Sequence, residues 1–226
     1  MKCLLEQASI KFPNAYAIFS EKNNITYREL NLWADSLAPK VSKRKQNCIA
    51  LETGPSASNL ILLWTLWRAG KTAILINTRL PKAVSTQQLK FLNSARLNNA
   101  ATILYTSGSS ASPKAVVHTY ENHYYSALGS QANIPLKVND RWLLSLPLYH
   151  VSGLSILFRC CLAGATVIIP SADKTLIQNI RDHKVTHLSL VSAQLYRLLH
   201  DKKNIPVLRR LKAILLGGGP VPAELI

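Results

Sequence analysis

Residues 102–119 read TILYTSGSSASPKAVVHT. The β-branched and aromatic residues from Thr102 to Tyr105 predict a buried strand. This strand leads into a turn rich in hydroxyl groups, Thr106 to Ser110, and Lys114 follows shortly after. Backbone N–H groups in such a turn form a concave anion site, and the lysine adds a mobile positive charge. The stretch therefore predicts a phosphate-binding loop between a strand and a helix that begins in the β-branched segment after Lys114.

The loop has two alternative interpretations, an ordinary connection and a Walker phosphate loop. A cluster of Ser, Gly and Pro between two elements is most often an ordinary connection without a ligand. The Walker phosphate loop requires a second Gly before the Lys and a Ser or Thr after it. Here Pro113 stands at the Gly position and Ala115 follows Lys114, so the Walker pattern is excluded.

The order Tyr-Thr-Ser-Gly-Ser-Ser-x-x-Pro-Lys at residues 105–114 resembles the phosphate loop of the adenylate-forming superfamily, which includes the acyl-CoA synthetases. Further motifs resemble, within that superfamily, the 2-succinylbenzoate–CoA ligases of menaquinone synthesis. The resemblance is strong from about residue 101 to the last residue, and weaker in residues 25–30 and 74–77. The motifs that carry it lie in residues 115–120, 142–153, 186–199 and 211–219.

The resemblance implies an α/β fold, the N-terminal part of the large domain of these enzymes, with layered αβαβ subdomains and mostly parallel sheets. Residues 1–100 would form a first αβ subdomain, shortened near 78–100. Residues 101–226 would form an incomplete subdomain with the phosphate loop and the acyl pocket. The C-terminal lid domain of the family, and the Tyr-Gly-x-Thr-Glu segment before it, are not encoded in residues 1–226.

The sequence pattern independently alternates helix and strand, which is typical of βαβ units. Residues 26–38 predict an amphipathic helix with Leu30, Trp33, Ala34 and Leu37 on one face. A second helix begins at a cap, Ser56 or Ser58, and ends at Trp67. We expect strands at 48–51, 72–76, 142–148, 165–169, 185–190 and 212–216, and further helices at 121–129, 154–162, 173–182 and 192–201.

Two residues in the second half of the chain are candidates for the acyl site. His150 follows the expected strand 142–148, where open α/β sheets commonly bind ligands. Arg159 is the one formally charged residue between Trp142 and Ala172. Its side chain must either reach water or meet an anion. For both residues a structural role is the alternative. By resemblance, His150 lines the acyl pocket and Arg159 binds a carboxylate of the substrate, with Ser189 on the substrate side.

The resemblance also implies the ligands. ATP would bind Thr106, Ser107, Gly108, Ser109, Ser110 and Lys114, and the glycines Gly217, Gly218 and Gly219 would wall the nucleotide and acyl pocket. Lys114, His150 and Arg159 would form the catalytic set. Mg²⁺ would bridge the phosphates without a dedicated protein site. The 2-succinylbenzoate carboxylate would attack the α-phosphate, and CoA would then displace AMP. Ala111 and Ala115 replace glycines that are usual in this loop.

Composition bounds these interpretations. The chain has 226 residues, 48% of them hydrophobic, which is enough to fill a sizeable core. The sequence shows no stretch long enough to span a membrane and no signal-like start, which predicts a cytoplasmic protein. The partners we expect are small molecules, and the sequence does not exclude a homo-oligomer. The cysteines show no metal or disulfide spacing, which predicts reduced packing residues. These are Cys3, Cys48, Cys160 and Cys161.

The formal net charge of +16 raises the alternative of a nucleic-acid-associated protein. The basic residues lie in separate segments, 40–45, 202–203 and 209–212, without a reader motif or interleaved aromatic residues, which disfavours nucleic acid as a partner. Two hypotheses rank above it. The chain is the front part of a 2-succinylbenzoate–CoA ligase, or it is a remnant that binds nucleotide or acyl ligand without turnover.

Overall fold

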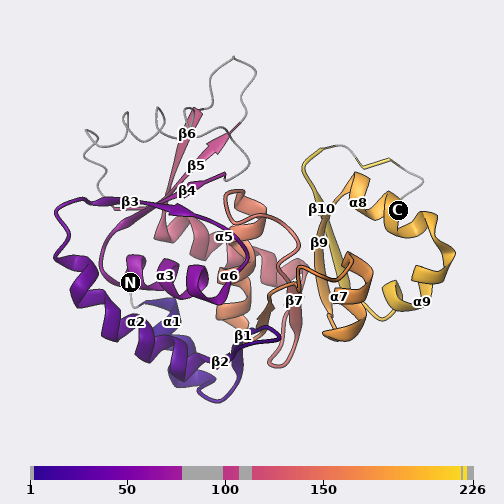
Figure 1. Ribbon diagram of the computed structural model, residues 1–226, viewed down its shortest axis with the longest axis horizontal. Coiled ribbons are helices and arrows are strands. Elements are labelled where there is room, and N and C mark those ends of the chain that lie inside the picture. Colours follow the sequence, from indigo (N-terminus) through magenta and orange to yellow (C-terminus); the bar gives the residue numbers. More distant parts are fainter. Residues whose placement is uncertain (1–2, 78–98, 107–113, 220, 223–226) are drawn as a thin grey trace.

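The computed structural model describes residues 3–77, 99–106, 114–219 and 221–222, and the fold is a mixed α/β arrangement of two sheets (Figure 1). The phosphate-loop residues 107–113 and the segment expected to be shortened, 78–98, lie outside the described residues. The elements, in chain order, are α1 (Leu4–Lys11), β1 (Tyr16–Phe19), β2 (Asn24–Thr26), α2 (Tyr27–Ser42), β3 (Cys48–Glu52), α3 (Ala57–Arg68), β4 (Thr72–Ile76), β5 (Ala100–Thr106), β6 (Lys114–Thr119), α5 (Tyr120–Asn133), β7 (Arg141–Leu143), α6 (Val151–Ala163), β8 (Thr166–Ile168), α7 (Leu176–Asp182), β9 (His187–Val191), α8 (Ser192–His200), the short 3₁₀ helix η1 (Lys202–Asn204), α9 (Ile205–Leu208) and β10 (Ala213–Gly217).

Both sheets are mostly parallel, which confirms the expected fold class. The first sheet has the strand order β3-β4-β5-β6, and the second has the order β10-β9-β7-β8-β1-β2. Among the described strands, β5 and β6 are the antiparallel pair of the first sheet, and β1 and β2 are that of the second. Each sheet takes strands from both sides of residue 100, and the division of the chain into subdomains at that residue stays a prediction.

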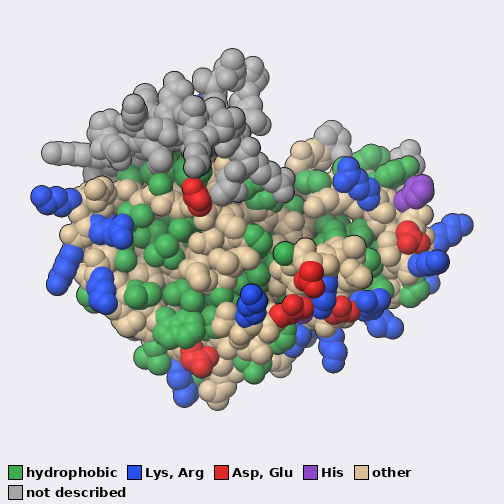
Figure 2. Space-filling model, viewed as in Figure 1, with side chains coloured by type: hydrophobic (Ala, Val, Ile, Leu, Met, Phe, Trp, Pro, Cys, Tyr) green, Lys and Arg blue, Asp and Glu red, His purple; other side chains and the backbone are tan. Residues whose placement is uncertain are grey.

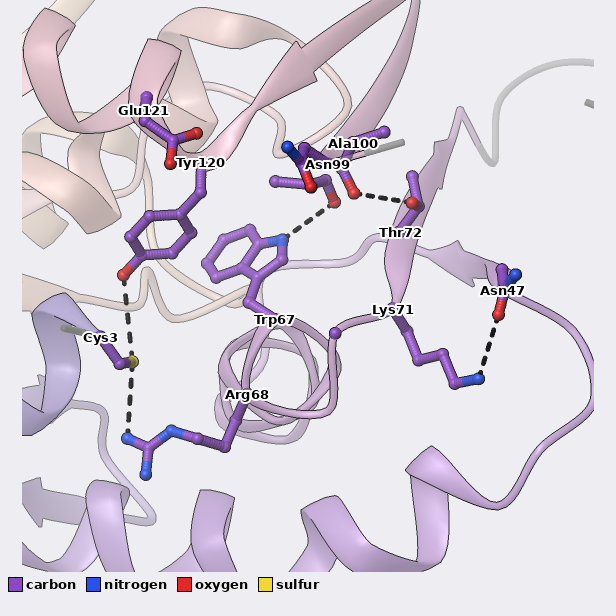
Figure 3. Close-up of a pocket in the computed structure, with 12 residues that line it drawn as sticks. Cys3, Asn47, Trp67, Arg68, Lys71, Thr72, Asn99, Ala100, Tyr120 and Glu121 are labelled. Atoms are coloured by element: carbon purple, nitrogen blue, oxygen red, sulfur yellow. Dashed lines mark hydrogen bonds between the residues drawn. The ribbon is translucent and has the colours of Figure 1, made fainter. Parts of the chain in front are cut away.

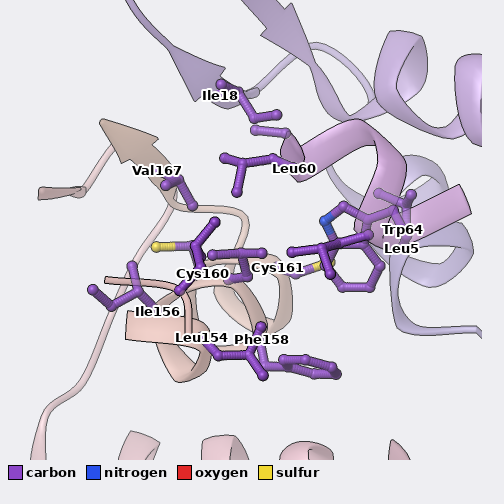
Figure 4. Packing of buried hydrophobic residues seen from close by; sticks show 14 of the residues in the cluster. Leu5, Ile18, Leu60, Trp64, Leu154, Ile156, Phe158, Cys160, Cys161 and Val167 are labelled. Atoms are coloured by element: carbon purple, nitrogen blue, oxygen red, sulfur yellow. The ribbon is translucent and has the colours of Figure 1, made fainter. Parts of the chain in front are cut away.

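Helices α5 and α6 join the two sheets. Helix α5 contacts β5 and β6 of the first sheet, α6 contacts β8 of the second, and the two helices pack against each other (Figure 1). Cys160 and Cys161 of α6 are buried among aliphatic and aromatic side chains such as Ile18 and Leu60 (Figure 4). All four cysteines are free thiols. Burial raises the pKa of the Cys160 and Cys161 thiols, so both are neutral packing residues.

Local sequence signals explain several element boundaries. Thr26 caps α2 in a reciprocal capping box with Glu29: the Thr26 hydroxyl accepts from the Glu29 N–H, and the Glu29 carboxylate accepts from the Thr26 N–H. Ser56 caps α3, which settles the choice between Ser56 and Ser58. Strand β4 is buried at every position and matches the expected range 72–76.

Some expectations about these elements were wrong. The helix face predicted for α2 is shifted: Leu30 and Ala34 are buried, but Trp33 and Leu37 are 43% and 39% exposed. Tyr27 and Ala38 complete the buried stripe instead. The segment after Lys114 forms strand β6, not the start of a helix, because Val116, Val117 and their neighbours favour extended backbone and pair with β5.

The strand expected at 142–148 is also shorter than predicted. Strand β7 ends at Leu143, and residues 146–150 form a turn that leads into α6. The strands β1 and β2 near the N-terminus, and helix α1 before them, were not individually anticipated. In the part of the chain that the structure describes, we find no helix with the length and apolar character needed to cross a bilayer.

Candidate functional site

A pocket of about 620 Å³ opens where strands of both sheets end. In mostly parallel sheets, the carboxyl ends of strands and the loops beyond them form the usual place for ligands. Residues at or just beyond the ends of β4, β5, β9 and β10 line this pocket, together with the first turn of α6 and part of β6. The lining residues are Leu75, Asn77, Leu104, Tyr105, Thr106, Val116, His118, Leu146, Tyr149, His150, Val151, Ser152, Val191 and Gly218. We refer to it as the carboxyl-end pocket.

Three of the candidate residues named from the sequence belong to this pocket: Thr106, His150 and Gly218. Thr106 is the last residue of β5 and pairs in register with Lys114, the first residue of β6. The Thr106 hydroxyl donates to the Lys114 carbonyl oxygen at 3.5 Å. Thr106 and Lys114 therefore flank the phosphate-loop segment on two paired strands. The remaining loop candidates, Ser107, Gly108, Ser109 and Ser110, lie outside the described residues.

His150 occupies the N-cap position of α6, with an extended backbone and an exposed side chain. Its imidazole stands edge-on to the Tyr149 ring, 4.7 Å between centroids. His150 was expected directly after a strand, but a turn separates it from β7. The position at the mouth of the carboxyl-end pocket is nevertheless compatible with contact to a ligand.

Gly153 fixes where helix α6 begins. A Cβ atom added to Gly153 would overlap the carbonyl oxygens of Leu146 and Pro147, so only glycine allows this close approach of helix and turn. The Gly153 and Leu154 N–H groups both donate to the His150 carbonyl oxygen at 3.1 Å. The close contact therefore fixes His150 at the pocket and sets the position of the residues farther along α6.

Arg159, two turns into α6, is the unusual charge of this region. Its guanidinium carbon lies 5.3 Å from the centroid of the Trp142 ring, a cation–π arrangement. The Nε and Nη1 atoms are buried and have no hydrogen-bond partner in the described part of the chain. Burial lowers the pKa of the guanidinium. Two donor nitrogens that are shielded from water and unpaired form a natural binding point for an anion.

Ser189 supports this arrangement from the neighbouring strand β9. Its hydroxyl accepts a hydrogen bond of 3.1 Å from the Trp142 indole N–H, and its carbonyl oxygen accepts one of 2.5 Å from Ser145. The side chain of Ser189 is buried and holds the ring on which Arg159 rests. Trp142 is the residue of this group that was not among the sequence candidates. Its only sequence signal was its place at the start of the 142–153 motif.

One of the three glycines at the end of β10 adopts a backbone conformation that favours glycine. Gly217 ends β10, and Gly218 has φ +90, where a side chain would be strained. Of the three glycines, Gly218 lines the carboxyl-end pocket. His118 and Tyr149, which also line it, were not named from the sequence. Nothing in their spacing distinguishes them from packing residues.

A second pocket, of about 590 Å³, lies at the opposite end of the first sheet, around the starts of β4 and β5 (Figure 3). Its polar side chains largely bind protein groups. Trp67 donates to the Ala101 carbonyl at 3.0 Å, the Thr72 hydroxyl donates to the Ala100 carbonyl at 2.7 Å, and Lys71 donates to Asn47 at 3.4 Å. This pocket, here called the amino-end pocket, holds none of the candidate residues named from the sequence.

Charged side chains are dispersed over the molecular surface. Figure 2 shows lysine and arginine side chains at the edge and within this face, some of them beside aspartate or glutamate side chains. Among the described residues, no group of three or more His, Cys, Asp or Glu side chains is arranged to hold a metal ion.

Comparison with known proteins gives a consistent result. The family model described as AMP-binding enzyme matches residues 84–226. The 2-succinylbenzoate–CoA ligase of Bacillus pumilus is 40% identical over 159 residues, which cover 70% of this chain and 32% of that protein. The 2-succinylbenzoate–CoA ligase of Bacillus velezensis is 30% identical over 268 aligned positions, which cover 99% of this chain and 54% of that protein.

Solved structures agree with these matches. The Bacillus subtilis o-succinylbenzoate CoA synthetase (MenE) in complex with its acyl-adenylate intermediate has a TM-score of 0.86 and 28% identity, covering 100% of this chain and 55% of that one. The same enzyme with ATP and a magnesium ion has a TM-score of 0.83 and 28% identity, covering 99% and 56%. The chain thus spans about half the length of these relatives. With the family model matched over more than half of its residues, this chain belongs to the AMP-binding enzyme family.

Proposed function

We propose that this chain is the front part of an ATP-dependent acid–thiol ligase that activates 2-succinylbenzoate and transfers it to CoA. The observation that carries the proposal is the Arg159 guanidinium on the Trp142 ring, whose Nε and Nη1 atoms are buried and have no partner among the described residues. A buried cation without an anionic partner is costly unless a ligand supplies the anion. An acid that is activated at one carboxylate and keeps a second carboxylate would supply it. The relatives named 2-succinylbenzoate–CoA ligase act, by their names, on such an acid.

In the proposed first step, the succinyl carboxylate of the substrate attacks the α-phosphate of ATP, a new C–O–P linkage forms, and pyrophosphate leaves. The carboxylate is already ionised at neutral pH, so the step needs positioning and charge stabilisation more than a general base. Thr106, the loop residues 107–110 and Lys114 would bind the departing phosphates. Arg159 would bind the ring carboxylate, with Trp142 and Ser189 holding the guanidinium in place.

In the proposed second step, the CoA thiol attacks the acyl carbonyl, the thioester forms, and AMP leaves. His150, at the mouth of the carboxyl-end pocket, would contact the acyl group as it enters, without acting as a proton acceptor. Gly218 would let the backbone approach the flat nucleotide closely. Mg²⁺ would enter together with ATP and neutralise part of the charge of its phosphates.

The loop assignment is tested by heating the chain with a stable acyl-adenylate analogue of 2-succinylbenzoate. We expect the analogue to raise the Tm of the wild-type chain, and Lys114→Ala to reduce that rise, because the lysine contacts the phosphate position. Lys45→Ala, a change at an exposed lysine outside the candidate site, is the matched control and should leave the rise intact. Equal protection of the wild-type and Lys114→Ala chains would show that Lys114 does not contact the ligand.

A further inference from the structure

His118, on strand β6, forms part of the carboxyl-end pocket wall contributed by the first sheet, whereas His150 stands on the first turn of α6. The Nδ1 atom of His118 is buried and has no hydrogen-bond partner among the described residues. A buried imidazole nitrogen without a partner is a costly arrangement. The proposed reaction, as set out above, gives His118 no role.

The His118 ring is held in place by a stack of rings. It lies nearly parallel to the His123 ring, with 5.3 Å between centroids and 26° between planes. His123 in turn stacks on Phe158 of α6, with 4.8 Å between centroids. The His123 Nε2 atom is 2.6 Å from the Thr102 hydroxyl, so His123 is oriented by its own hydrogen bond. His118 is therefore a fixed group, preorganised before a ligand binds.

The chemistry of His118 differs from that of Arg159. Burial lowers the pKa of His118, so the imidazole is neutral near pH 7. A neutral imidazole carries hydrogen on one nitrogen and accepts at the other. Its best partner is an uncharged oxygen, whereas a carboxylate pairs better with the charged guanidinium of Arg159.

We propose that His118 determines substrate specificity by donating a hydrogen bond from Nδ1–H to the keto oxygen of the acyl substrate. This inference rests on the proposed function. Of the three oxygen-bearing groups of 2-succinylbenzoate, one carboxylate reacts and Arg159 binds the other. The ketone remains, and a carbonyl taken out of water without a hydrogen bond loses free energy. Among the described residues that line the pocket, His118 carries the buried side-chain nitrogen without a hydrogen-bond partner, and this nitrogen can compensate the loss.

A thermodynamic cycle that combines a substitution at His118 with a change in the ligand tests the inference on the 226-residue chain. The ligands are 2-succinylbenzoate and its analogue with a methylene group in place of the ketone, and calorimetry gives the Kd of each. The variants are His118→Leu, which removes the donor, and His118→Asn, whose amide can place a nitrogen close to the position of Nδ1. Val116→Ala is the matched control, because Val116 lines the same pocket from the same strand and has no polar side-chain atom.

We expect wild type to bind the keto acid about three- to tenfold more tightly than the methylene acid, which is the range of one neutral hydrogen bond. His118→Leu should weaken the keto acid by that factor and leave the methylene acid unchanged, and His118→Asn should restore part of the difference. Val116→Ala should change both acids equally. Thermal melts of each variant identify any loss of folding. If His118→Leu does not fold, the affinities of His118→Asn for the two acids are compared with those of wild type.

Equal affinity of wild type for the two acids, or an equal loss for both in a folded His118→Leu chain, would overturn the role of His118 and leave the proposed function standing. Failure of wild type to bind either acid would instead overturn the proposed acyl site, and the role of His118 with it.

Discussion

Two partly buried arginines, Arg68 and Arg159, meet their surroundings differently. Arg68, at the end of α3, forms an ion pair with Asp35 and donates to Asn31 at 2.6 Å. Burial works to lower the pKa of Arg68, but Cys3 and the carboxylates of Asp35 and Glu6 raise it, and the net shift is upward. Arg159 has a ring face in place of a carboxylate, and its pKa is lowered.

The difference separates a structural cation from a cation that can bind a ligand. The two pockets have nearly the same volume, about 590 Å³ and 620 Å³, so size does not distinguish them. The two regions differ in whether a carboxylate of the protein pairs with the arginine. Arg68 joins α2 to α3 through Asp35 and Asn31 and leaves its buried Nε unpaired, whereas Arg159 leaves both Nε and Nη1 unpaired and has no carboxylate partner in the described part of the chain. Substitutions can test this difference between the two arginines.

The largest expected effect concerns the position of α6, which carries Arg159. Gly153→Ala should lower the free energy of unfolding by about 3 kcal/mol, because the added methyl overlaps the Leu146 and Pro147 carbonyl oxygens. Urea unfolding at pH 7 gives the value. Gly129→Ala is the control: it lies within helix α5, nothing lies within 4 Å of the added methyl, and we expect a gain of about 0.5–1 kcal/mol. Equal tolerance of both changes would refute the tight contact at Gly153.

Replacing each arginine by leucine compares the two cations directly. Arg68→Leu should lower the free energy of unfolding by about 2 kcal/mol, because charged hydrogen bonds to Asp35 and Asn31 are lost. Arg159→Leu should leave the free energy of unfolding unchanged or raise it, because a buried unpaired charge is removed. Parallel urea titrations measure both. A loss of stability in Arg159→Leu as large as in Arg68→Leu would mean that Arg159 is structural.

A smaller effect is expected at Asp140, a buried carboxylate close to Trp142 that does have a partner. The Lys212 ammonium lies 2.5 Å from one Asp140 oxygen, and the Lys137 N–H donates to the other at 2.9 Å. Burial alone would raise the pKa of Asp140, but these hydrogen bonds outweigh it, and the pKa falls below its ordinary value of 3.8.

A carboxyl group with a lowered folded-state pKa stabilises the fold above the unfolded-state pKa, and this contribution disappears as the pH falls through the folded-state pKa. The contribution of Asp140 should therefore be complete at neutral pH and be lost below pH 3.8. Asp140→Asn should lower the free energy of unfolding at neutral pH by about 1 kcal/mol, a small value because the partner Lys212 is largely exposed. It should also flatten the dependence of stability on acid pH, because the titrating carboxyl group is removed. An unchanged slope in urea titrations at several acid pH values would contradict the assignment.

Much of the fold could be predicted from local sequence signals. Thr26 with Glu29, Ser56, and the buried run of β4 each specify an element through contacts within a few residues. The errors arose where tertiary pairing decides. The segment after Lys114 becomes a strand because β5 lies alongside it, and β7 stops early because the turn at 146–150 packs against Gly153.

The candidate site was only partly predictable for the same reason. The motif order singled out Thr106, Lys114, His150 and Arg159, because those residues recur at fixed spacings in the family that the sequence resembles. The sequence does not indicate that the Arg159 donors would be unpaired, since this depends on Trp142 and Ser189 on neighbouring strands. His118 was overlooked because its place in the ring stack with His123 and Phe158 is a purely tertiary feature.

The central claim is that Arg159 binds the second carboxylate of a dicarboxylic acid. Calorimetry on wild-type and Arg159→Leu chains tests it most directly. The ligands are 2-succinylbenzoate and the same acid without its ring carboxylate. We predict that wild type prefers the dicarboxylate by about 1.5–3 kcal/mol, the range of a hydrogen bond to a charged group, and that Arg159→Leu abolishes this preference. A folded Arg159→Leu chain that keeps the full preference for the dicarboxylate would contradict the claim.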